Sequence, residues 1–388
     1  METHNKLRLE GAQRTCSPSE TLARMRPYFE QAGITRVSEI TGLDRIGIPV
    51  AQCIRPDAAV LSVDSGKGAT PEAAQCSAVM EGFERHVGET CELTAYRGTA
   101  YEMGTIETRF PRIRGAVFNY DTVIDWTKVY GIRSKTPVYV PEDVVRMTLT
   151  HPVLPLFRAP FISTSNGLSS GNTLDEAICG GLYEVIERDQ VHCCIARGSL
   201  GIRVDLDTIA DKTLIGLITT LRFNCVMPVL FDCTLDLGVP TYMAYIYDVE
   251  RGVGIYRGYA AHLDPAIAQC RAICEAVQAR LVWMSGSRDD WGSQQFAKSK
   301  ISDNAETITS LMAGKETVSS TRHSDNSTDS FRGDIDIVLG LLEAAGIPEP
   351  LLKVYDHPYP CSVVKVLIPT LEGYYGKLIQ TGTRGFSL

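Results

Sequence analysis

One acidic helical pattern occurs twice in this chain, in stretches that are far apart in sequence. The first stretch is GKGATPEAAQCSAVMEGFERH, residues 66–86, and the second is FISTSNGLSSGNTLDEAICGGLYEVIERDQ, residues 161–190. Two glutamates and an arginine recur at one constant offset: Glu184, Glu187 and Arg188 repeat Glu81, Glu84 and Arg85. Solvated helix faces have no physical reason to keep such a register. The repeat therefore predicts helices that bring acidic side chains to one place.

A third, looser copy lies at residues 266–280, AIAQCRAICEAVQAR. There Ala268, Glu275 and Gln278 keep the Ala-x6-Glu-x2-(Glu/Gln) spacing of the first two stretches. We therefore expect three related helices, which the periodicity places at about 70–89, 173–197 and 264–285.

The second stretch joins a small, polar, glycine-bearing loop, Ser163 to Thr173, to a long helical pattern. Such a loop can cradle a phosphate with its backbone N–H groups. Glu184 and Glu187 share one helix face because they are three residues apart, and Glu176 lies about two turns earlier. Carboxylates in this arrangement can hold Mg²⁺ through oxygen. The pattern predicts a nucleotide phosphate and its metal, although Glu-x-x-Glu-Arg is more commonly a solvated face with an internal ion pair.

Composition excludes several other classes of protein. A net charge of −8 and the absence of a basic run argue against a nucleic-acid partner. No apolar stretch approaches the length of a membrane span, and the N-terminal residues METHNKLRLEGAQR lack the apolar segment of a signal peptide. We expect a cytoplasmic protein that binds no membrane.

The twelve cysteines do not indicate a metal site. None forms Cys-x2-Cys, the adjacent Cys193 and Cys194 have poor geometry for chelation, and no second ligand pair accompanies Cys270 and Cys274. Free thiols acting as small apolar fillers are expected in a reducing compartment. A catalytic thiol stays open, but no cysteine is singled out by a histidine partner.

Strand and helix patterns alternate unevenly, which favours an α/β or α+β fold with internal pseudo-symmetry. We expect a single domain in four parts. Residues 1–56 supply an N-terminal helix and strands, 57–295 the core, 296–334 a polar surface loop or lid, and 335–388 a C-terminal helix, strands and tail. The segment WTKVYGIRSKTPVYVP is typical of a hairpin.

The three repeated segments resemble the ATP-site segments of the YcaO superfamily. The resemblance continues in ETLARMRPYFEQAGITRVSEITGLDRIGIPV, SGSRDDW and VVKVLIPTLEG, so that it covers most of the chain. It implies mixed sheets packed with helices around a central ATP site. It also implies a reaction in which the oxygen of a peptide or protein backbone amide attacks the γ-phosphate of ATP. A side chain of the substrate then gives an azoline, external sulfide a thioamide, and an amine an amidine.

The physical demand of that reaction fits the acidic pattern. An amide oxygen is a weak nucleophile and the triphosphate is highly anionic, so catalysis must come from positioning and from metal ions that neutralise charge. By resemblance, the Mg²⁺ ligands are Glu81, Glu84, Glu176, Glu184 and Glu187. The residues expected around ATP are Arg14, Thr21, Ser77, Ser169, Asn172, Arg188, Glu275, Gln278 and Arg280. The catalytic assignments are Glu187, Arg188 and Glu84. Plain structural roles compete with three of the assignments: helix packing for Ser77, a helix cap for Asn172, and pairing with Arg85 for Glu81.

The subclass of the family is inferred from departures from its azoline-forming members. Those members usually end in Pro-x-Pro-x-Pro, whereas this sequence ends RGFSL and lacks their fused leader-binding domain. It looks more like the stand-alone members encoded beside a TfuA-like partner, which are associated with thioamide formation. The resemblance thus implies a peptide or protein substrate, a TfuA-like partner, a sulfide donor and a homodimer.

Two hypotheses that assign the chain to other classes of protein remain. One is a non-catalytic ATP-binding accessory factor for methylthiolation of a ribosomal protein. The other is a carboxylate-bridged di-iron oxidoreductase, which requires Glu-x-x-His. His86 and His192 follow the acidic runs but lie off that spacing, which disfavours the di-iron class.

Overall fold

The computed structural model of the chain describes residues 5–147, 160–249, 254–291, 316–373, 382 and 384–387. Contacts divide the chain into two units, each assembled from segments that are distant in sequence. Unit 1 comprises residues 1–57, 61–82 and 199–329, and unit 2 comprises 58–60, 83–198 and 330–388. Helix α2 (Pro71–Thr90) begins in unit 1 and ends in unit 2. Within the described residues, no helix is both long enough and apolar enough to span a membrane.

Unit 1 is built on a five-stranded sheet in the order β13-β12-β11-β10-β14. The strands are β10 (Ile202–Asp205), β11 (Val226–Asp232), β12 (Thr241–Asp248), β13 (Ile255–Ala261) and β14 (Thr317–Ser319). All pairs are antiparallel except β10–β14. Strand β12 is buried along its whole length. Of the predicted loop or lid at 296–334, residues 296–315 lie outside the described residues. The described remainder, from residue 316, contains β14.

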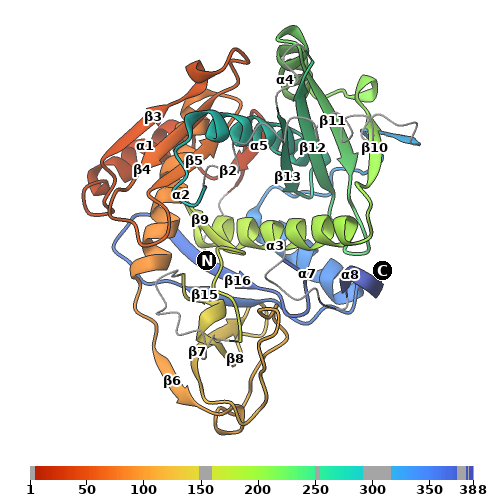
Figure 1. The fold of residues 1–388 in the computed structure, drawn as a ribbon. Coiled ribbons are helices and arrows are strands. Elements are labelled where there is room, and N and C mark those ends of the chain that lie inside the picture. Colours follow the sequence, from red (N-terminus) through yellow and green to blue (C-terminus); the bar gives the residue numbers. More distant parts are fainter. Residues whose placement is uncertain are drawn as a thin grey trace. The chain divides into compact units, whose positions relative to one another are not determined.

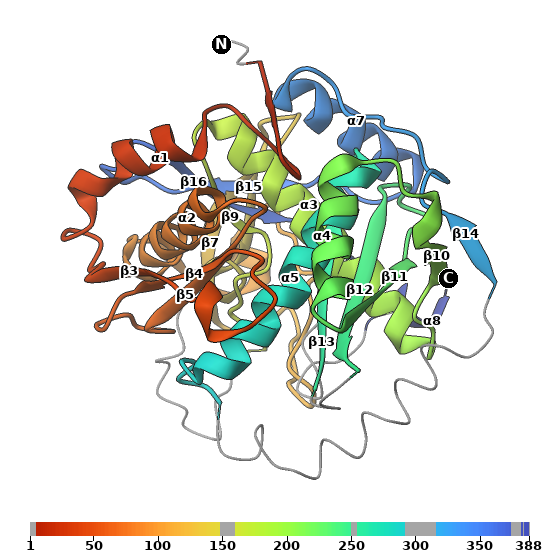
Figure 2. The same cartoon turned by 90° about the horizontal axis from the view of Figure 1, so that it is seen from above.

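Helices α4 (Lys212–Phe223) and α5 (Pro265–Ser285) pack together against this sheet, as Figure 2 shows. Helix α5 begins where Asp264 accepts a hydrogen bond from the backbone N–H of Ala266 at 2.9 Å, and Pro265 fills the first turn. Burial raises the pKa of the Cys274 thiol in α5 to about 11. A thiol that stays protonated at neutral pH packs as a small apolar group, as expected.

A three-stranded antiparallel sheet completes unit 1, together with an N-terminal hairpin and helix (Figure 1). The elements are β1 (Leu7–Leu9), β2 (Ala12–Arg14), α1 (Pro18–Met25), β3 (Arg36–Glu39), β4 (Val50–Ile54) and β5 (Val63–Lys67). Helix α1 starts in a capping box, in which Ser17 and Glu20 each bond to the backbone N–H of the other. Strand β5 leads into α2, which carries the first acidic copy.

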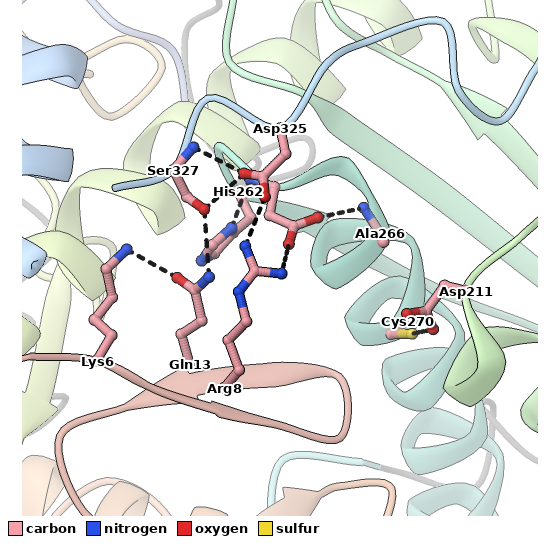
Figure 3. A network of polar contacts seen from close by, with 10 residues as sticks. Lys6, Arg8, Gln13, Asp211, His262, Ala266, Cys270, Asp325 and Ser327 are labelled. Atoms are coloured by element: carbon pink, nitrogen blue, oxygen red, sulfur yellow. Dashed lines mark hydrogen bonds and ion pairs between the residues drawn. The ribbon is translucent and has the colours of Figure 1, made fainter. Parts of the chain in front are cut away.

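Polar contacts tie the β1–β2 hairpin to the segment before residue 330 (Figure 3). Arg8 donates to Asp325 at 2.7 Å, and Gln13 donates to the Ser327 hydroxyl at 3.3 Å. His262 is 4% exposed, and its Nδ1 accepts from the backbone N–H of Asp264 at 2.9 Å. Burial lowers the pKa of His262 well below its ordinary value. The positive charges of Arg271, Lys6 and Arg14 lower it further.

Acidification is therefore expected to destabilise the protein through His262. The unfolded chain protonates this imidazole near pH 6.5, roughly its ordinary pKa, whereas the buried ring stays neutral. Because the unfolded state binds the extra proton, the stability due to the neutral ring is complete above that pH. Below that pH, the free energy of unfolding decreases by up to about 1.4 kcal/mol per pH unit. Urea unfolding at several pH values should show a shallower acid slope for His262→Gln, and an unchanged slope would contradict the assignment.

Unit 2 contains a six-stranded antiparallel sheet in the order β6-β7-β15-β16-β9, with β8 also paired to β7 (Figure 1). Its strands are β6 (Ala95–Gly98), β7 (Ile124–Gly131), β8 (Pro137–Pro141), β9 (Leu168–Gly171), β15 (Leu351–Val354) and β16 (Ser362–Leu367). The predicted hairpin is the β7–β8 pair.

Helix α3 (Leu174–Ala196) packs on β9 and β16 and also contacts two further helices, α7 (Phe331–Ala344) and α8 (Arg384–Ser387). The α3 range matches the second predicted acidic helix closely. Helices and several sheets together confirm the predicted mixed α/β class. The pseudo-symmetry and the division into four parts stay predictions.

Candidate functional site

Helix α3 is buried on almost every side, and its charged residues lie in one narrow strip. Between Glu176 and Cys194, the residues that are not buried are Gly180, Glu184, Glu187, Arg188 and His192. Their spacing places them on one face of the helix. A helix that is buried nearly all round belongs to a core, so the solvated-face reading of Glu-x-x-Glu-Arg does not apply here. The side chains of Glu184 and Arg188 are 26% and 29% exposed and form an i,i+4 ion pair.

Residues at the start of α3 hold the side chain of Glu176, the first acid of the pattern, in place. Thr173 is the N-cap, and its hydroxyl accepts from the backbone N–H of Glu176 at 3.3 Å. Asn172 instead donates to both carboxylate oxygens of Glu176, at 3.3 and 3.4 Å. The carboxylate of Glu176 is thereby held beside the polar loop, where Glu176 is 6% exposed. Asn172 orients an acid and is not the helix cap.

Two glycines allow the polar loop to approach α3 and β16. A Cβ at Gly167, which has φ of +77°, would lie 2.1 Å from the carbonyl oxygen of Val366. A Cβ at Gly180 would lie 2.5 Å from the Ser169 hydroxyl. Only glycine permits such approaches. The Ser169 hydroxyl therefore lies against α3 at Gly180, one turn before Glu184, and its role toward phosphate stays a prediction.

A buried cation that the sequence analysis did not single out lies in β16, the strand that packs against α3. Lys365, in β16, is 1% exposed, and its ammonium group donates to the carbonyl oxygen of Thr164. Burial lowers the pKa of Lys365 to about 7; Glu184 and Glu84 oppose that shift, and Arg188 adds to it. The available sequence signal was a single lysine in the otherwise apolar run CSVVKVLIP, since a cation at a buried strand position requires a partner.

Among the described residues, no three carboxylate, thiol or imidazole groups converge as a ready-made metal cage. Glu84, Glu176, Glu184 and Glu187 are nevertheless the oxygen donors that Mg²⁺ prefers. Mg²⁺ typically takes one or two carboxylates together with phosphate oxygens of the nucleotide. The donor set of unit 2 therefore fits magnesium that arrives with a nucleotide.

In unit 1, helix α5 carries the third copy of the acidic pattern and contacts β5. Glu275 forms an ion pair with Lys67, and Gln278 donates to the carbonyl oxygen of Ser65 at 2.7 Å. One face of α5 thus presents both residues to the strand that precedes α2. Lys67 is a second cation that the sequence reading did not single out.

Other predicted unit 1 residues have structural partners of their own. Arg280 is 2% exposed and donates to Asp44 at 2.6 Å and to Asp248 at 3.3 Å. Thr21 is buried, and its hydroxyl donates to the carbonyl oxygen of Ser17 at 3.1 Å. Arg14, in β2, donates to the carbonyl oxygen of Gln13. Ser77 and Glu81 are half-buried on the part of α2 that belongs to unit 1. Their roles toward the nucleotide stay predictions.

Comparison with known proteins now identifies the family. The profile of the YcaO cyclodehydratases, which is that of an ATP- and Mg²⁺-binding family, matches residues 65–372. The chain belongs to the YcaO family. It is similar to an uncharacterized protein of Methanothermobacter thermautotrophicus, with 33% identity over 92% of this chain and 94% of the relative. It is also similar to an uncharacterized protein in the tfuA 3′ region of Rhizobium leguminosarum bv. trifolii, with 30% identity over 96% of this chain and 91% of the relative.

Solved structures share the fold at lower identity. A heterocyclase in complex with substrate and cofactor has a TM-score of 0.80 at 22% identity, over 99% of this chain and 55% of that chain. A YcaO protein from Methanopyrus kandleri, bound with AMPPCP and Mg²⁺, has a TM-score of 0.76 at 22% identity, over 96% of this chain and 95% of that chain. The predicted family and fold, and ATP and Mg²⁺ as its cofactors, are confirmed.

Proposed function

We propose that this protein uses ATP and Mg²⁺ to phosphorylate the oxygen of a backbone amide in a peptide or protein. The observation that carries the proposal is the narrow strip on α3, where Glu184, Glu187 and Arg188 are half-buried in an otherwise buried helix. Half-buried charges in a core helix cost free energy that a solvated face does not, so a binding role accounts for them. The cyclodehydratase description of the family, and a heterocyclase of the same fold that is bound to substrate and cofactor, support a reaction of this kind.

In this proposal, different residues of unit 2 bind Mg²⁺, bind the phosphates and stabilise the phosphoryl group. Glu84, Glu176, Glu184 and Glu187 would hold Mg²⁺, which, when bound, supplies neutralisation of the charge on the phosphates. Ser169, Asn172 and the backbone N–H groups of the polar loop would bind phosphate oxygens. Arg188 would leave Glu184 to stabilise the phosphoryl group, because a guanidinium binds phosphate oxygens in two-point geometry.

The roles of the unit 1 residues rest on the family resemblance. Glu81 is assigned to metal, and the residues assigned to the nucleotide are Arg14, Thr21, Ser77, Glu275, Gln278 and Arg280. Arg280 is the weakest of these assignments on physical grounds, because its guanidinium already forms buried ion pairs with Asp44 and Asp248.

We propose a thioamide as the product, with sulfide as the nucleophile and a TfuA-like protein as the partner. The relative from the tfuA 3′ region supports this choice. Azoline or amidine formation is the first alternative, and an ATP-binding accessory role in ribosomal-protein methylthiolation is the second. A cytoplasmic homodimer is part of the same proposal.

The product can be read by mass spectrometry. Enzyme, TfuA-like partner, ATP, Mg²⁺ and sulfide are incubated with candidate peptides or proteins. We expect each modified site to gain the mass difference between sulfur and oxygen, and a reaction without sulfide is the control. Loss of one water per site would instead mean cyclodehydration. ATP turnover that no substrate stimulates would favour the accessory role.

A further inference from the structure

Asn166, in the polar loop, has a side-chain oxygen without a hydrogen-bond donor. The residue is half-buried, and its Oδ1 is shielded from water with no partner in the part of the chain that the structure describes. A buried acceptor without a donor costs free energy, and most such groups in folded proteins are paired. The loop backbone around it is paired: the N–H of Asn166 donates to the Thr164 hydroxyl at 3.2 Å, and the N–H of Leu168 donates to the carbonyl oxygen of Ser165 at 2.8 Å. A ligand bound at the loop is one source of the missing donor.

The loop holds Asn166 close to the half-buried strip of α3. A Cβ at Gly167 would lie 2.8 Å from the side chain of Val185, and a Cβ at Gly181 would lie 3.0 Å from the carbonyl oxygen of Gly167. Glu184 lies between these two α3 residues in the sequence. Because Asn166 directly precedes Gly167, its side chain is attached where the loop meets the turn of α3 that carries Glu184.

The chemistry of the unpaired atom limits the ligand that it can take. The Oδ1 of asparagine is a hydrogen-bond acceptor, and the ionised oxygens of a triphosphate offer no proton to it. The other group that the proposed reaction brings to this loop is the backbone amide that is phosphorylated. In a trans amide the oxygen and the N–H point in opposite directions. An amide whose oxygen faces the γ-phosphate therefore directs its N–H away from the phosphate, where it can meet an acceptor.

We propose that Oδ1 of Asn166 accepts a hydrogen bond from the N–H of the target amide and so orients the amide oxygen toward the γ-phosphate. The inference rests on the proposed function. When the oxygen attacks, its bond to phosphorus forms, the bond from phosphorus to the bridging oxygen breaks, and ADP leaves. The proton stays on the nitrogen, which becomes more positive, so its hydrogen bond to Oδ1 strengthens in the transition state. Peptide bonds that precede proline have no N–H, so the proposal excludes them as substrates.

The test uses two small amides that differ in this one N–H group. N-methylacetamide has the N–H of a peptide bond, and N,N-dimethylacetamide lacks it. Each is titrated onto the protein in the presence of Mg²⁺ and the non-hydrolysable analogue AMPPCP, and the melting temperature is followed. We expect the native protein to respond to N-methylacetamide at a midpoint at least about threefold lower, because one hydrogen bond separates the two amides.

Asn166→Leu removes the acceptor and keeps the branched shape of the side chain. The variant should respond to both amides at one midpoint and should bind Mg²⁺ and AMPPCP as the native protein does. Without ligands it should unfold at no lower a urea concentration, because an apolar group replaces an unpaired oxygen. Asn166→Ala takes its place if the leucine variant does not fold.

Thr127→Val is the matched control. Thr127, in β7, is 1% exposed, and its hydroxyl also lacks a partner among the residues that the structure describes. This variant removes a second unpaired oxygen of unit 2, outside the polar loop. It should keep the native discrimination between the two amides.

A native protein that responds equally to both amides, or to neither, would overturn the proposal. Weaker binding of Mg²⁺ and AMPPCP by the Asn166 variants would assign Asn166 to the metal or the nucleotide instead. Loss of urea stability in Asn166→Leu and Asn166→Ala alike would assign it to the folding of the loop. None of these measurements needs ATP turnover. Failure of the proposed function is therefore seen separately, as a native protein that binds AMPPCP but does not hydrolyse ATP.

Discussion

Replacing Glu187 with Gln is expected to lower ATP turnover by at least about 100-fold while the protein stays folded. Glutamine keeps the size of the side chain but cannot neutralise or bind a cation as a carboxylate does. Glu187 lies in the narrow half-buried strip of α3, so the change removes charge without opening a cavity. Phosphate release, measured with saturating Mg²⁺ and substrate, reports the loss, and circular dichroism checks the fold.

Glu72→Gln is the matched control, because Glu72 is exposed in the first turn of α2. It should keep native turnover. If Glu187→Gln also kept native turnover, the assignment of the strip on α3 to catalysis would be wrong. If the native protein bound ATP without turning it over, the accessory role would replace the enzymatic one.

Replacing Arg384 with Met is expected to cost about 3–5 kcal/mol of unfolding free energy. Arg384 donates from Nε and Nη2 to the carboxylate of Asp189, at 3.0 and 2.8 Å, and Asp189 is 0% exposed. The backbone N–H of Glu372 donates to the same carboxylate at 2.8 Å. Burial raises the pKa of Asp189 and Arg384 opposes that shift, so the variant would leave a buried carboxylate without its cation. Urea unfolding measures the loss.

The exposed ion pair between Arg133 and Glu343, 2.9 Å apart, gives the control. Arg133→Met should cost no more than about 1 kcal/mol. Adding Asp189→Asn to Arg384→Met should recover part of the stability, because the orphaned charge is then removed. If Arg384→Met and Arg133→Met lowered the unfolding free energy equally, the buried ion pair would stabilise the protein no more than the exposed one. Asp189 directly follows Arg188, so this pair also fixes the helix that carries the site.

Local signals in the sequence predicted the helices that carry the candidate site. The repeated Glu-x-x-Glu-Arg register located α3 and its face, and Thr173, Asp264 and Pro265 begin helices close to where the pattern places them. These features depend on helical periodicity and on side chains bonding to backbone within one turn, which adjacent residues are enough to determine.

Long-range partners could not be predicted in the same way. Lys365 and Thr164 are 201 residues apart, Arg280 and Asp44 are 236 apart, and Arg384 and Asp189 are 195 apart. Arg280 was assigned to the nucleotide by resemblance, whereas the structure pairs it with two buried aspartates.

The amino-acid sequence by itself determined the three helices, the shared register of their acids and the family. Only the tertiary structure decided that α3 is buried nearly all round, that Glu184 and Arg188 are therefore not a solvated pair, and that Lys365 is buried with its ammonium group on the carbonyl oxygen of Thr164. The physical reason is that periodicity is a property of neighbours along the chain. Burial, and the electrostatic free energy that depends on it, is set by segments that meet only after folding.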